Sequence, residues 1–240
     1  PTLATLDAVM RERGVHGAVG EIGVFHGRGF VPLALLRRAG ERAVAVDVFE
    51  QQHLNQDASG AGDEEAFHAT LRRFGVTAGV VVLRIDSTAL GAEALLEAAG
   101  GGVRLLSVDG SHTEAATSSD LQLAAATLVD GGVCLLDDAL NPDWPGVASG
   151  LVRHLSSVDP LAGHRRLIPF ALGYNKCLLT TSEEWARAYG GALAPLGRKR
   201  AVLMGHECLI LAAGWIAAHF GNDAPVGSGE AAHGGMGASL

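Results

Sequence analysis

Short apolar runs alternate along the chain with segments whose apolar residues recur at helical spacing. The runs are rich in valine, leucine and alanine, a pattern that predicts strands buried on both faces. Five such strands are expected over residues 18–24, 43–47, 80–85, 103–108 and 133–136. Helices are expected over residues 3–13, 30–38, 64–74, 89–99 and 114–128, the last one stopped by Gly131-Gly132.

This alternation favours one fold class. Strand and helix alternate five times with short connections, which implies right-handed crossovers and parallel strands with helices on both faces. We therefore predict an α/β fold, a Rossmann-like three-layer αβα sandwich whose sheet is mostly parallel.

The pattern changes in the last third of the chain. Helices are expected over residues 147–158, 183–189 and 206–220, and strands over residues 166–170 and 174–180. The two strands flank Ala171-Leu172-Gly173, which predicts an antiparallel C-terminal hairpin at the edge of the sheet. The run Arg198-Lys199-Arg200 is interpreted as a solvated basic face. Residues 1–220 are expected to form a single domain beginning with an N-terminal helix in residues 1–14, and residues 221–240 a flexible Gly-rich tail.

Composition narrows the class of protein. A chain of 240 residues with 48% hydrophobic residues suits one α/β domain with a sizeable core. The net charge of -8 and the pI of about 5.6 disfavour nucleic acid or an anionic membrane as a partner. The cysteines form no C-x-x-C pair, and their odd number fits a reducing compartment. No apolar run reaches the roughly 18 residues that span a bilayer, so a cytoplasmic protein is expected.

Each of the five strands expected first ends on or near an acidic residue. Ligands of open parallel sheets bind at the carboxyl ends of the strands, so these acids mark the expected site. The segments concerned are residues 21–27, Asp47, Asp86-Ser87, residues 109–112 and Asp137-Asp138.

The first of these segments is the glycine-rich turn Glu21-Ile22-Gly23-Val24-Phe25-His26-Gly27. Its glycines allow the backbone to approach a ligand closely, but the pattern is not the G-x-G-x-x-G of dinucleotide enzymes. Asp47 ends the second strand, where a carboxylate can accept both ribose hydroxyls of an adenosine. Asp86-Ser87, after the third strand, could meet an adenine edge. Ordinary turn or N-cap roles remain open for these residues.

Four segments carry a family resemblance. They are Val19-Gly20-Glu21-Ile22-Gly23-Val24-Phe25-His26-Gly27, Val46-Asp47-Val48-Phe49, Ser107-Val108-Asp109-Gly110-Ser111-His112 and Asp130-Gly131-Gly132-Val133-Cys134-Leu135-Leu136-Asp137-Asp138. Over residues 15–180 the chain resembles the class I S-adenosylmethionine-dependent methyltransferases. Within that class it resembles the group of macrocin O-methyltransferase-like and cephalosporin-hydroxylase-like proteins.

The resemblance implies a methyltransferase domain that binds S-adenosylmethionine and methylates a hydroxyl of a small molecule or a sugar moiety, as in natural product biosynthesis. Residues implied in cofactor binding are Glu21, Gly23, Val24, Phe25, Gly27, Asp47, Val48, Asp86, Ser87 and Asp109.

A second implication concerns a metal. Asp109, Asp137 and Asp138 would lie at adjacent strand ends, where carboxylates repel each other unless a cation or a proton is present. Sugar-modifying members of the group hold Mg²⁺ with such acids, so the resemblance implies a magnesium site with these three ligands. His112 would be the general base, with Asp109 as the second catalytic residue. Several relatives carry an acid where this chain has Ser111.

The acceptor end is less defined. Asn141 and Trp144, in the loop of residues 141–146, and His53, in the polar loop of residues 51–63, are candidate substrate residues. The second loop could act as a lid. Weaker candidates are Asn55, Tyr174, Asn175 and Lys176. Sugars, glycosylated natural products and small phenols all remain open as acceptors.

Other functional classes share parts of this sequence pattern. A NAD-dependent oxidoreductase also uses a glycine turn and an acid after the second strand. The absence of a G-x-G-x-x-G motif and the acids after the fourth and fifth strands argue against this function. A non-catalytic nucleotide-binding partner subunit with the same fold stays open, as does assembly into a homo-oligomer. A hydroxylase is disfavoured, because the chain lacks a recognisable set of two histidines and one carboxylate.

Overall fold

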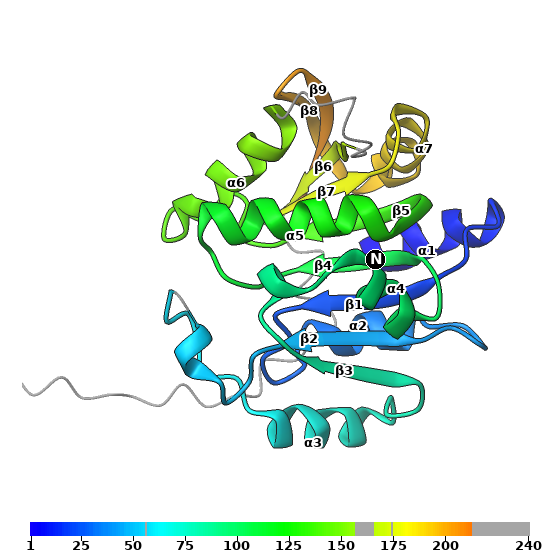
Figure 1. Cartoon of the computed structure of the whole chain (residues 1–240). Helices are drawn as coiled ribbons and strands as arrows, with labels where there is room; N and C mark the ends of the chain where they lie inside the picture. Colours follow the sequence, from blue (N-terminus) through cyan, green and yellow to red (C-terminus); the bar gives the residue numbers. More distant parts are fainter. Residues whose placement is uncertain (56, 157–165, 174, 213–240) are drawn as a thin grey trace, which may run out of the picture.

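The computed structural model describes residues 1–55, 57–156, 166–173 and 175–212 (Figure 1). The first half of the chain forms α1 (Thr2–Glu12), β1 (Ala18–Ile22), α2 (Phe30–Leu35), β2 (Ala43–Asp47), η1 (Gln52–Leu54), α3 (Glu64–Phe74), β3 (Val80–Arg84), η2 (Ser87–Ala89), α4 (Ala92–Ala99) and β4 (Val103–Val108). The second half forms α5 (Glu114–Thr127), β5 (Leu128–Leu136), α6 (Pro145–Ser156), β6 (Ile168–Gly173), β7 (Lys176–Thr180), α7 (Glu183–Leu193), η4 (Ala194–Leu196), β8 (Gly197–Leu203) and β9 (His206–Leu211).

Within the described residues, nine strands form one sheet in the order β3-β2-β1-β4-β5-β7-β6-β9-β8. The strands from β3 to β5 are mutually parallel, and β7 joins β5 in the antiparallel sense. The strand order reverses between β1 and β4, which is where open α/β sheets bind their ligands. The predicted α/β class, with a mostly parallel sheet and antiparallel strands at the C-terminal end, is confirmed.

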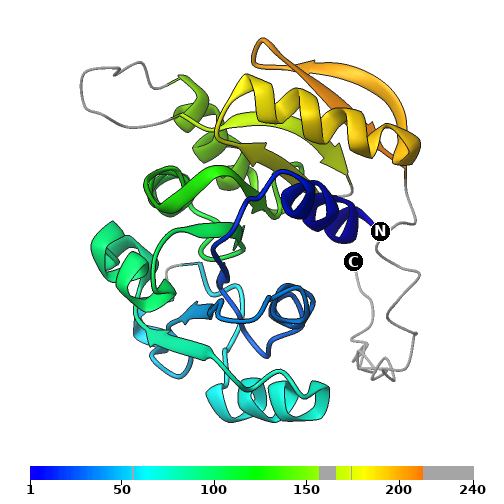
Figure 2. The same cartoon turned by 90° about the vertical axis from the view of Figure 1, so that its right-hand side faces the viewer.

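Helices cover both faces of the sheet, as Figure 2 shows. One hydrophobic core joins the sheet to α1, α2, α3 and α7, through side chains such as Met10, Phe30, Phe67 and Tyr189. The other core joins the opposite face to α4, α5 and α6, with Leu95, Leu121 and Leu151 among its members. The inner parallel strands β1, β2 and β4 are therefore buried between two helical layers, which explains their continuous apolar runs, while β3 at the edge is partly exposed.

Helix α3 illustrates how local sequence sets the boundaries of an element. The Asp63 side chain accepts a hydrogen bond from the amide of Ala66 and caps the first turn, and Gly75 ends the helix in the left-handed conformation with φ of 67°. Both signals are readable in the sequence, and the predicted range of residues 64–74 agrees with the structure. The predicted ranges of β2 and β4 agree as well.

The expected helix stop at Gly131-Gly132 is wrong. The fifth helix ends at Thr127 and β5 begins at Leu128, so both glycines lie inside the strand. The register between β4 and β5 shifts there, and Gly131 has φ of +77°. A Cβ atom at Gly131 would lie 2.6 Å from the Trp185 ring. These glycines serve an irregular strand that packs against α7.

Two other expectations for the C-terminal part need correction. Ala171-Leu172-Gly173 belongs to β6 and is not the hairpin turn, because Gly173 pairs with Lys176 and only two residues separate the strands. The start of the helix expected over residues 206–220 is instead β9, paired with β8 around Met204 and Gly205, whose φ values of 49° and 88° suit a tight hairpin turn. The rest of that helix and the tail of residues 221–240 lie outside the described residues.

The basic run Arg198-Lys199-Arg200 lies on β8, the edge strand, and is exposed as expected. Charged side chains on an edge strand oppose pairing with a further strand. Along the described part of the chain, no helix combines the length and apolar character needed to cross a membrane.

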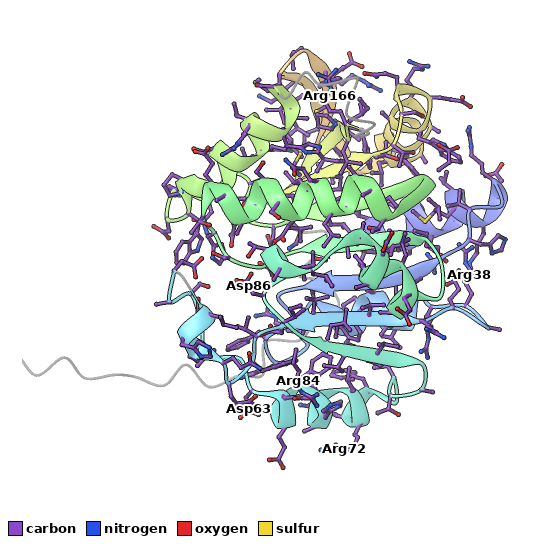
Figure 3. The ribbon with its side chains drawn as sticks, in the orientation of Figure 1. Arg38, Asp63, Arg72, Arg84, Asp86 and Arg166 are labelled. Carbon is purple, nitrogen blue, oxygen red and sulfur yellow. The ribbon has the colours of Figure 1, made fainter. Side chains whose placement is uncertain are left out.

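A buried ion network fastens α1 to the amino ends of the strands. The fully buried guanidinium of Arg104 on β4 donates to Asp7 Oδ1 on α1 at 3.0 Å and to Glu41 Oε2 at 2.9 Å. Arg38 donates to the same Asp7 oxygen at 2.8 Å. Figure 3 shows Arg38 at the edge of the sheet opposite to Asp86, so this network lies far from the carboxyl ends of the strands.

Candidate active site

A pocket of about 370 Å³ opens at the carboxyl ends of β1, β2, β3 and β4. Asp86 lies at this edge in Figure 3, and the loop of residues 51–63 lies beyond the strand ends in Figure 1. Ten predicted site residues line the pocket, namely Gly23, Phe25, Asp47, Val48, Asp86, Ser87, Asp109, His112, Asp138 and Trp144.

The glycine turn after β1 is shaped by close approach of the backbone. Gly23 has φ of +82°, and a Cβ atom there would lie 1.8 Å from the carbonyl oxygen of Asp109. The turn therefore presses against the end of β4, and only glycine fits at this position. Val24 points into the core and Gly27 packs on Phe67, so these two predicted cofactor residues shape the turn without lining the pocket.

Glu21 lies beneath the turn rather than in the pocket. Its side chain is buried, and its Oε2 atom has no hydrogen-bond partner among the described residues. Burial raises the pKa of Glu21 well above its usual range, and the negative charge of Asp109 adds to the rise. A Cβ atom at Gly29 would lie 2.3 Å from Glu21 Oε1, so the glycine leaves room for this carboxyl group.

Asp47 ties together the two turns that flank one end of the pocket. Its Oδ2 atom accepts a hydrogen bond from the amide of Phe25 at 2.8 Å, and its Oδ1 atom accepts one from the amide of Phe49 at 2.7 Å. Each carboxylate oxygen has a further lone pair, so Asp47 can still accept hydroxyl donors from a ligand.

At the neighbouring strand end, Asp86 Oδ1 accepts from the amide of Thr88 at 2.9 Å and caps η2, while Asp86 and Ser87 also line the pocket. The capping role and the pocket role proposed from the sequence are therefore compatible.

Behind this wall of the pocket, burial raises the pKa of Asp120 on α5 to about 7. A Cβ atom at Gly110 would lie 3.2 Å from Asp120 Oδ2, which places this unpredicted acid directly behind the pocket wall.

The acids at the ends of β4 and β5 divide into two groups. Asp137 forms an ion pair with Lys176 Nζ and does not line the main pocket. Asp109, His112 and Asp138 do come together, with one ligand atom of each within 4.8 Å of the others. Burial raises the pKa of Asp109 to about 8, and the charges of Asp137 and Asp138 add to the rise. Of the three predicted metal ligands, the structure thus gathers two with His112 and turns Asp137 toward a lysine.

Asp138 is held from several sides. It has φ of 54°, and its Oδ1 atom accepts hydrogen bonds from Asn141 Nδ2 at 2.9 Å and from Asn175 Nδ2. Asn141 therefore braces the acid instead of lining the pocket. Asn175 and Lys176, both weaker candidates in the sequence, bind the two adjacent aspartates from the start of β7. Tyr174 lies outside the described residues.

His112 is fixed by three contacts. Its Nε2 atom lies 3.0 Å from Asp138 Oδ2 and its Nδ1 atom 3.0 Å from Asp57 Oδ2. The Trp144 ring stacks on the imidazole, with ring centroids 4.2 Å apart and planes at 19°. Trp144 is thus both a pocket wall and a support for the histidine.

Asp57 is the site residue that sequence reasoning missed. Besides the imidazole, its Oδ2 atom accepts hydrogen bonds from the amide of His112 and from Ser111 Oγ, the latter at 3.2 Å. Burial alone would raise the pKa of Asp57, but hydrogen bonds from Ser59 and His112 outweigh it and lower the pKa to about 2. The polar character of the loop was visible in the sequence, but no pattern there distinguishes Asp57 from its neighbours.

The same loop corrects one substrate candidate. His53 is exposed and does not line the pocket, whereas Gln52, Leu54 and Asn55 on the same short helical turn do. Asn55 Nδ2 donates to the carbonyl of Gly60 at 2.7 Å and holds the loop in this arrangement.

Comparison with known proteins agrees with this geometry. Residues 21–139, about half of the chain, match the family described as a methyltransferase domain. No curated protein sequence matches the chain. Its structure is similar to that of CalS11, described as a TDP-rhamnose 3'-O-methyltransferase of calicheamicin biosynthesis, with 23% identity, a TM-score of 0.51 and coverage of 75% of this chain and 79% of the other. It is also similar to the O-methyltransferase NovP, with 15% identity, a TM-score of 0.58 and coverage of 76% and 79%.

The matched segment begins at Glu21, in the glycine turn, and ends just after Asp138, so it contains the strand ends that form the pocket. The match to a methyltransferase domain, at the strand ends that form the pocket, favours a methyltransferase over the oxidoreductase and hydroxylase alternatives. The chain carries a methyltransferase domain and belongs to the class I S-adenosylmethionine-dependent methyltransferases.

Proposed function

We propose that this methyltransferase transfers the methyl group of S-adenosylmethionine to a hydroxyl oxygen of a small molecule or a sugar moiety. The observation that carries the proposal is the continuity of a single pocket. One end holds Asp47 and Asp86, and the other holds Asp138, His112 and Trp144. In this proposal the first end binds adenosine and the second, polar and aromatic end binds the acceptor, within one cavity.

The residues at the first end suit the methyl donor. The crowded glycine turn at Gly23 brings backbone to the pocket wall without a side chain, and Asp47 retains acceptor capacity for ribose hydroxyls. Asp86 and Ser87 offer polar atoms for the adenine edge. Val48 and Ile85 supply apolar wall on the same side.

The reaction proposed for the second end is a direct displacement. The acceptor oxygen forms a bond to the methyl carbon while the carbon–sulfur bond breaks, and its electron pair remains on the sulfur of S-adenosylhomocysteine. The hydroxyl proton passes to His112, for which the hydroxyl would replace Asp138 as the partner of Nε2. The remaining contribution of the protein is to hold donor and acceptor in line.

A divalent cation, Mg²⁺ in our proposal, fits the same end. Asp109, His112 and Asp138 offer ligand atoms close to one another. The pKa of Asp109 is raised first by burial and then by the negative charges of Asp137 and Asp138, which a cation would offset. Asp109 and Asp138 would supply the oxygen ligands, while Asp137 is engaged by Lys176. When bound, such an ion lowers the pKa of a coordinated hydroxyl.

The acceptor class is proposed from chemistry and from likeness. An aromatic ring beside polar side chains is a common surface for a sugar or a phenol, and the similar enzyme CalS11 is described as acting on TDP-rhamnose. We therefore favour a sugar or a glycosylated natural product. A cytoplasmic location is part of the same proposal, supported by the free, buried thiols of Cys134, Cys177 and Cys208.

Transfer of an isotopically labelled methyl group tests the proposal. The wild-type protein is incubated with labelled S-adenosylmethionine and a panel of sugar nucleotides, glycosides and phenols, with Mg²⁺ or with a chelator. Label is expected on a hydroxyl oxygen, to be lost in His112→Gln and retained in the matched control His53→Gln, which alters an exposed histidine outside the pocket. Donor binding without transfer to any acceptor would instead favour the non-catalytic partner subunit.

A further inference from the structure

The loop of residues 51–63 contributes a carboxylate to the acceptor end of the pocket. Asp57 lies 55 residues before His112 in the chain, yet its Oδ2 atom meets the ring nitrogen Nδ1, the backbone amide of His112 and the Ser111 hydroxyl. The Asp57 side chain is only 9% exposed and that of His112 only 11%. The contact therefore joins two nearly buried groups.

We propose that Asp57 is the positioning residue of His112. By accepting a hydrogen bond from Nδ1, Asp57 fixes the hydrogen of the imidazole on that nitrogen and directs Nε2 toward the acceptor end. This inference rests on the proposed function, because it gives the orientation of the group that would receive the hydroxyl proton.

The geometry around the ring supports this assignment. A neutral imidazole carries one hydrogen, and the partner of one nitrogen decides which tautomer forms. Asp57 is acceptor-only as a carboxylate, so Nδ1 donates in their hydrogen bond. By the same rule a hydrogen lies between Nε2 and Asp138 Oδ2 as long as Asp138 is the partner of Nε2. Nε2 can accept the hydroxyl proton once an acceptor or an ion has replaced that contact, while Asp57 keeps the other hydrogen on Nδ1. Stacking on Trp144 fixes the plane of the ring, and Asp57 then fixes its rotation within that plane.

The two carboxylates that contact the ring differ in their other contacts. Asp138 Oδ2 faces Nε2 from the strand end, within the group of atoms that could hold a cation. Asp57 is outside that group, and its other oxygen accepts from the amide of Ser59 within the loop. Asp57 can therefore hold Nδ1 while Asp138 exchanges its partner for an acceptor or an ion.

The loop of residues 51–63 positions Asp57 as well as lining the pocket. Because Asp57 comes from the same loop as Asn55, Gly60 and Gly62, which line the pocket, the loop must adopt the described arrangement for Asp57 to reach Nδ1. The same loop arrangement thus lines this side of the pocket and places Asp57 against His112.

Nitrogen-15 NMR of the histidine ring tests the proposal without knowledge of the acceptor. Long-range proton–nitrogen spectra distinguish a ring nitrogen that carries hydrogen from one that does not, and the His112 signals are assigned by their loss in His112→Gln. In the wild-type protein, Nδ1 is expected to carry a hydrogen protected from solvent exchange. Asp57→Ala should abolish that protection, and Asp57→Asn, which keeps an acceptor oxygen, should restore part of it.

Ser111→Ala is the matched control. It removes a hydrogen bond to the same Asp57 oxygen but leaves the ring contact, so the His112 signals should remain as in the wild-type protein. A wild-type Nδ1 without hydrogen, or identical ring spectra in Asp57→Ala and Ser111→Ala, would overturn the proposal. Thermal melting of each variant checks that it is folded.

Titration of the same samples with S-adenosylhomocysteine separates this inference from the proposed function. If no sample binds the ligand, the proposed function fails, while the ring spectra still decide the role of Asp57. If the samples bind equally, methyl transfer to an acceptor found in the screen should show kcat reduced about tenfold or more in Asp57→Ala, with KM for the donor unchanged. An unchanged kcat would contradict the positioning role.

Discussion

Several acids around the pocket have pKa values displaced upward by burial. Asp109 and Asp120 are shifted to about 8 and about 7, and the pKa of Glu21 is raised as well. A buried carboxyl group in this state retains its proton at pH values where the unfolded chain has released it. The folded protein therefore carries acids that disfavour ionisation, with Asp109 in the pocket and Glu21 and Asp120 behind its wall.

The stability of the protein should fall with rising pH because of these residues. An acid whose folded-state pKa is raised contributes stability below its unfolded pKa of about 4, and this contribution is lost as the pH rises through the folded-state value. Asp120→Asn replaces the carboxyl group with a neutral group of similar shape. We expect this variant to be more stable than the wild-type protein at pH 8, with a smaller difference at pH 5, as measured by urea unfolding at both values.

Asp143→Asn provides the control for loss of one negative charge, because Asp143 is an exposed carboxylate in the loop of residues 141–146. An Asp120→Asn variant whose stability differs from that of the wild-type protein by the same amount at pH 5 and pH 8 would show that Asp120 does not titrate in this interval.

Among the secondary-structure elements, α1 depends on charged rather than purely apolar contacts. Asp7 and Glu41 form ion pairs with the buried guanidinium of Arg104. The pKa of each acid is lowered. Burial alone would raise both values, but hydrogen bonds from arginine residues outweigh it. Their contribution to stability is present above the unfolded pKa and is lost as the pH falls through the lower folded-state value.

Removal of the central arginine should destabilise the protein strongly. Arg104→Ala leaves Glu41 without its arginine partner and Asp7 with fewer partners, both largely buried, and breaking a buried ion pair in this way costs about 3–5 kcal/mol. Arg153→Ala is the control, because its exposed pair with Glu114 is worth about 0–1 kcal/mol. Urea unfolding of both variants at neutral pH gives the comparison, and equal losses would refute the importance of the network.

Burial and helix capping determine which elements could be predicted from the sequence. The five parallel strands and their helices could be predicted because burial on both faces leaves continuous apolar runs and the helix ends carry caps such as Asp63 and Gly75. The region after Thr180 was harder, because the apolar run around Cys208–Leu211 fits a helix or a strand equally well. The turn at Met204-Gly205 decides for a strand.

At the scale of the whole molecule, the pocket is assembled from segments spread over more than a hundred residues. The sequence was sufficient to predict the acids at the strand ends, because parallel strands bring their carboxyl ends to one edge. It could not predict that Asp57 reaches His112 or that Lys176 reaches Asp137, since both contacts depend on loop paths and on the antiparallel order of β7. The matched domain contains Asp57, but Lys176 lies outside it.

The proposed methyl transfer depends on donor binding in this pocket. Isothermal titration of the folded protein with S-adenosylhomocysteine measures it directly. We expect one saturable site per chain, with affinity reduced about tenfold or more in Asp47→Asn, because that side chain cannot accept two ribose hydroxyls as a carboxylate does. Absence of binding to the folded wild-type protein, or binding that Asp47→Asn leaves unchanged, would contradict the placement of the methyl donor at the end of β2.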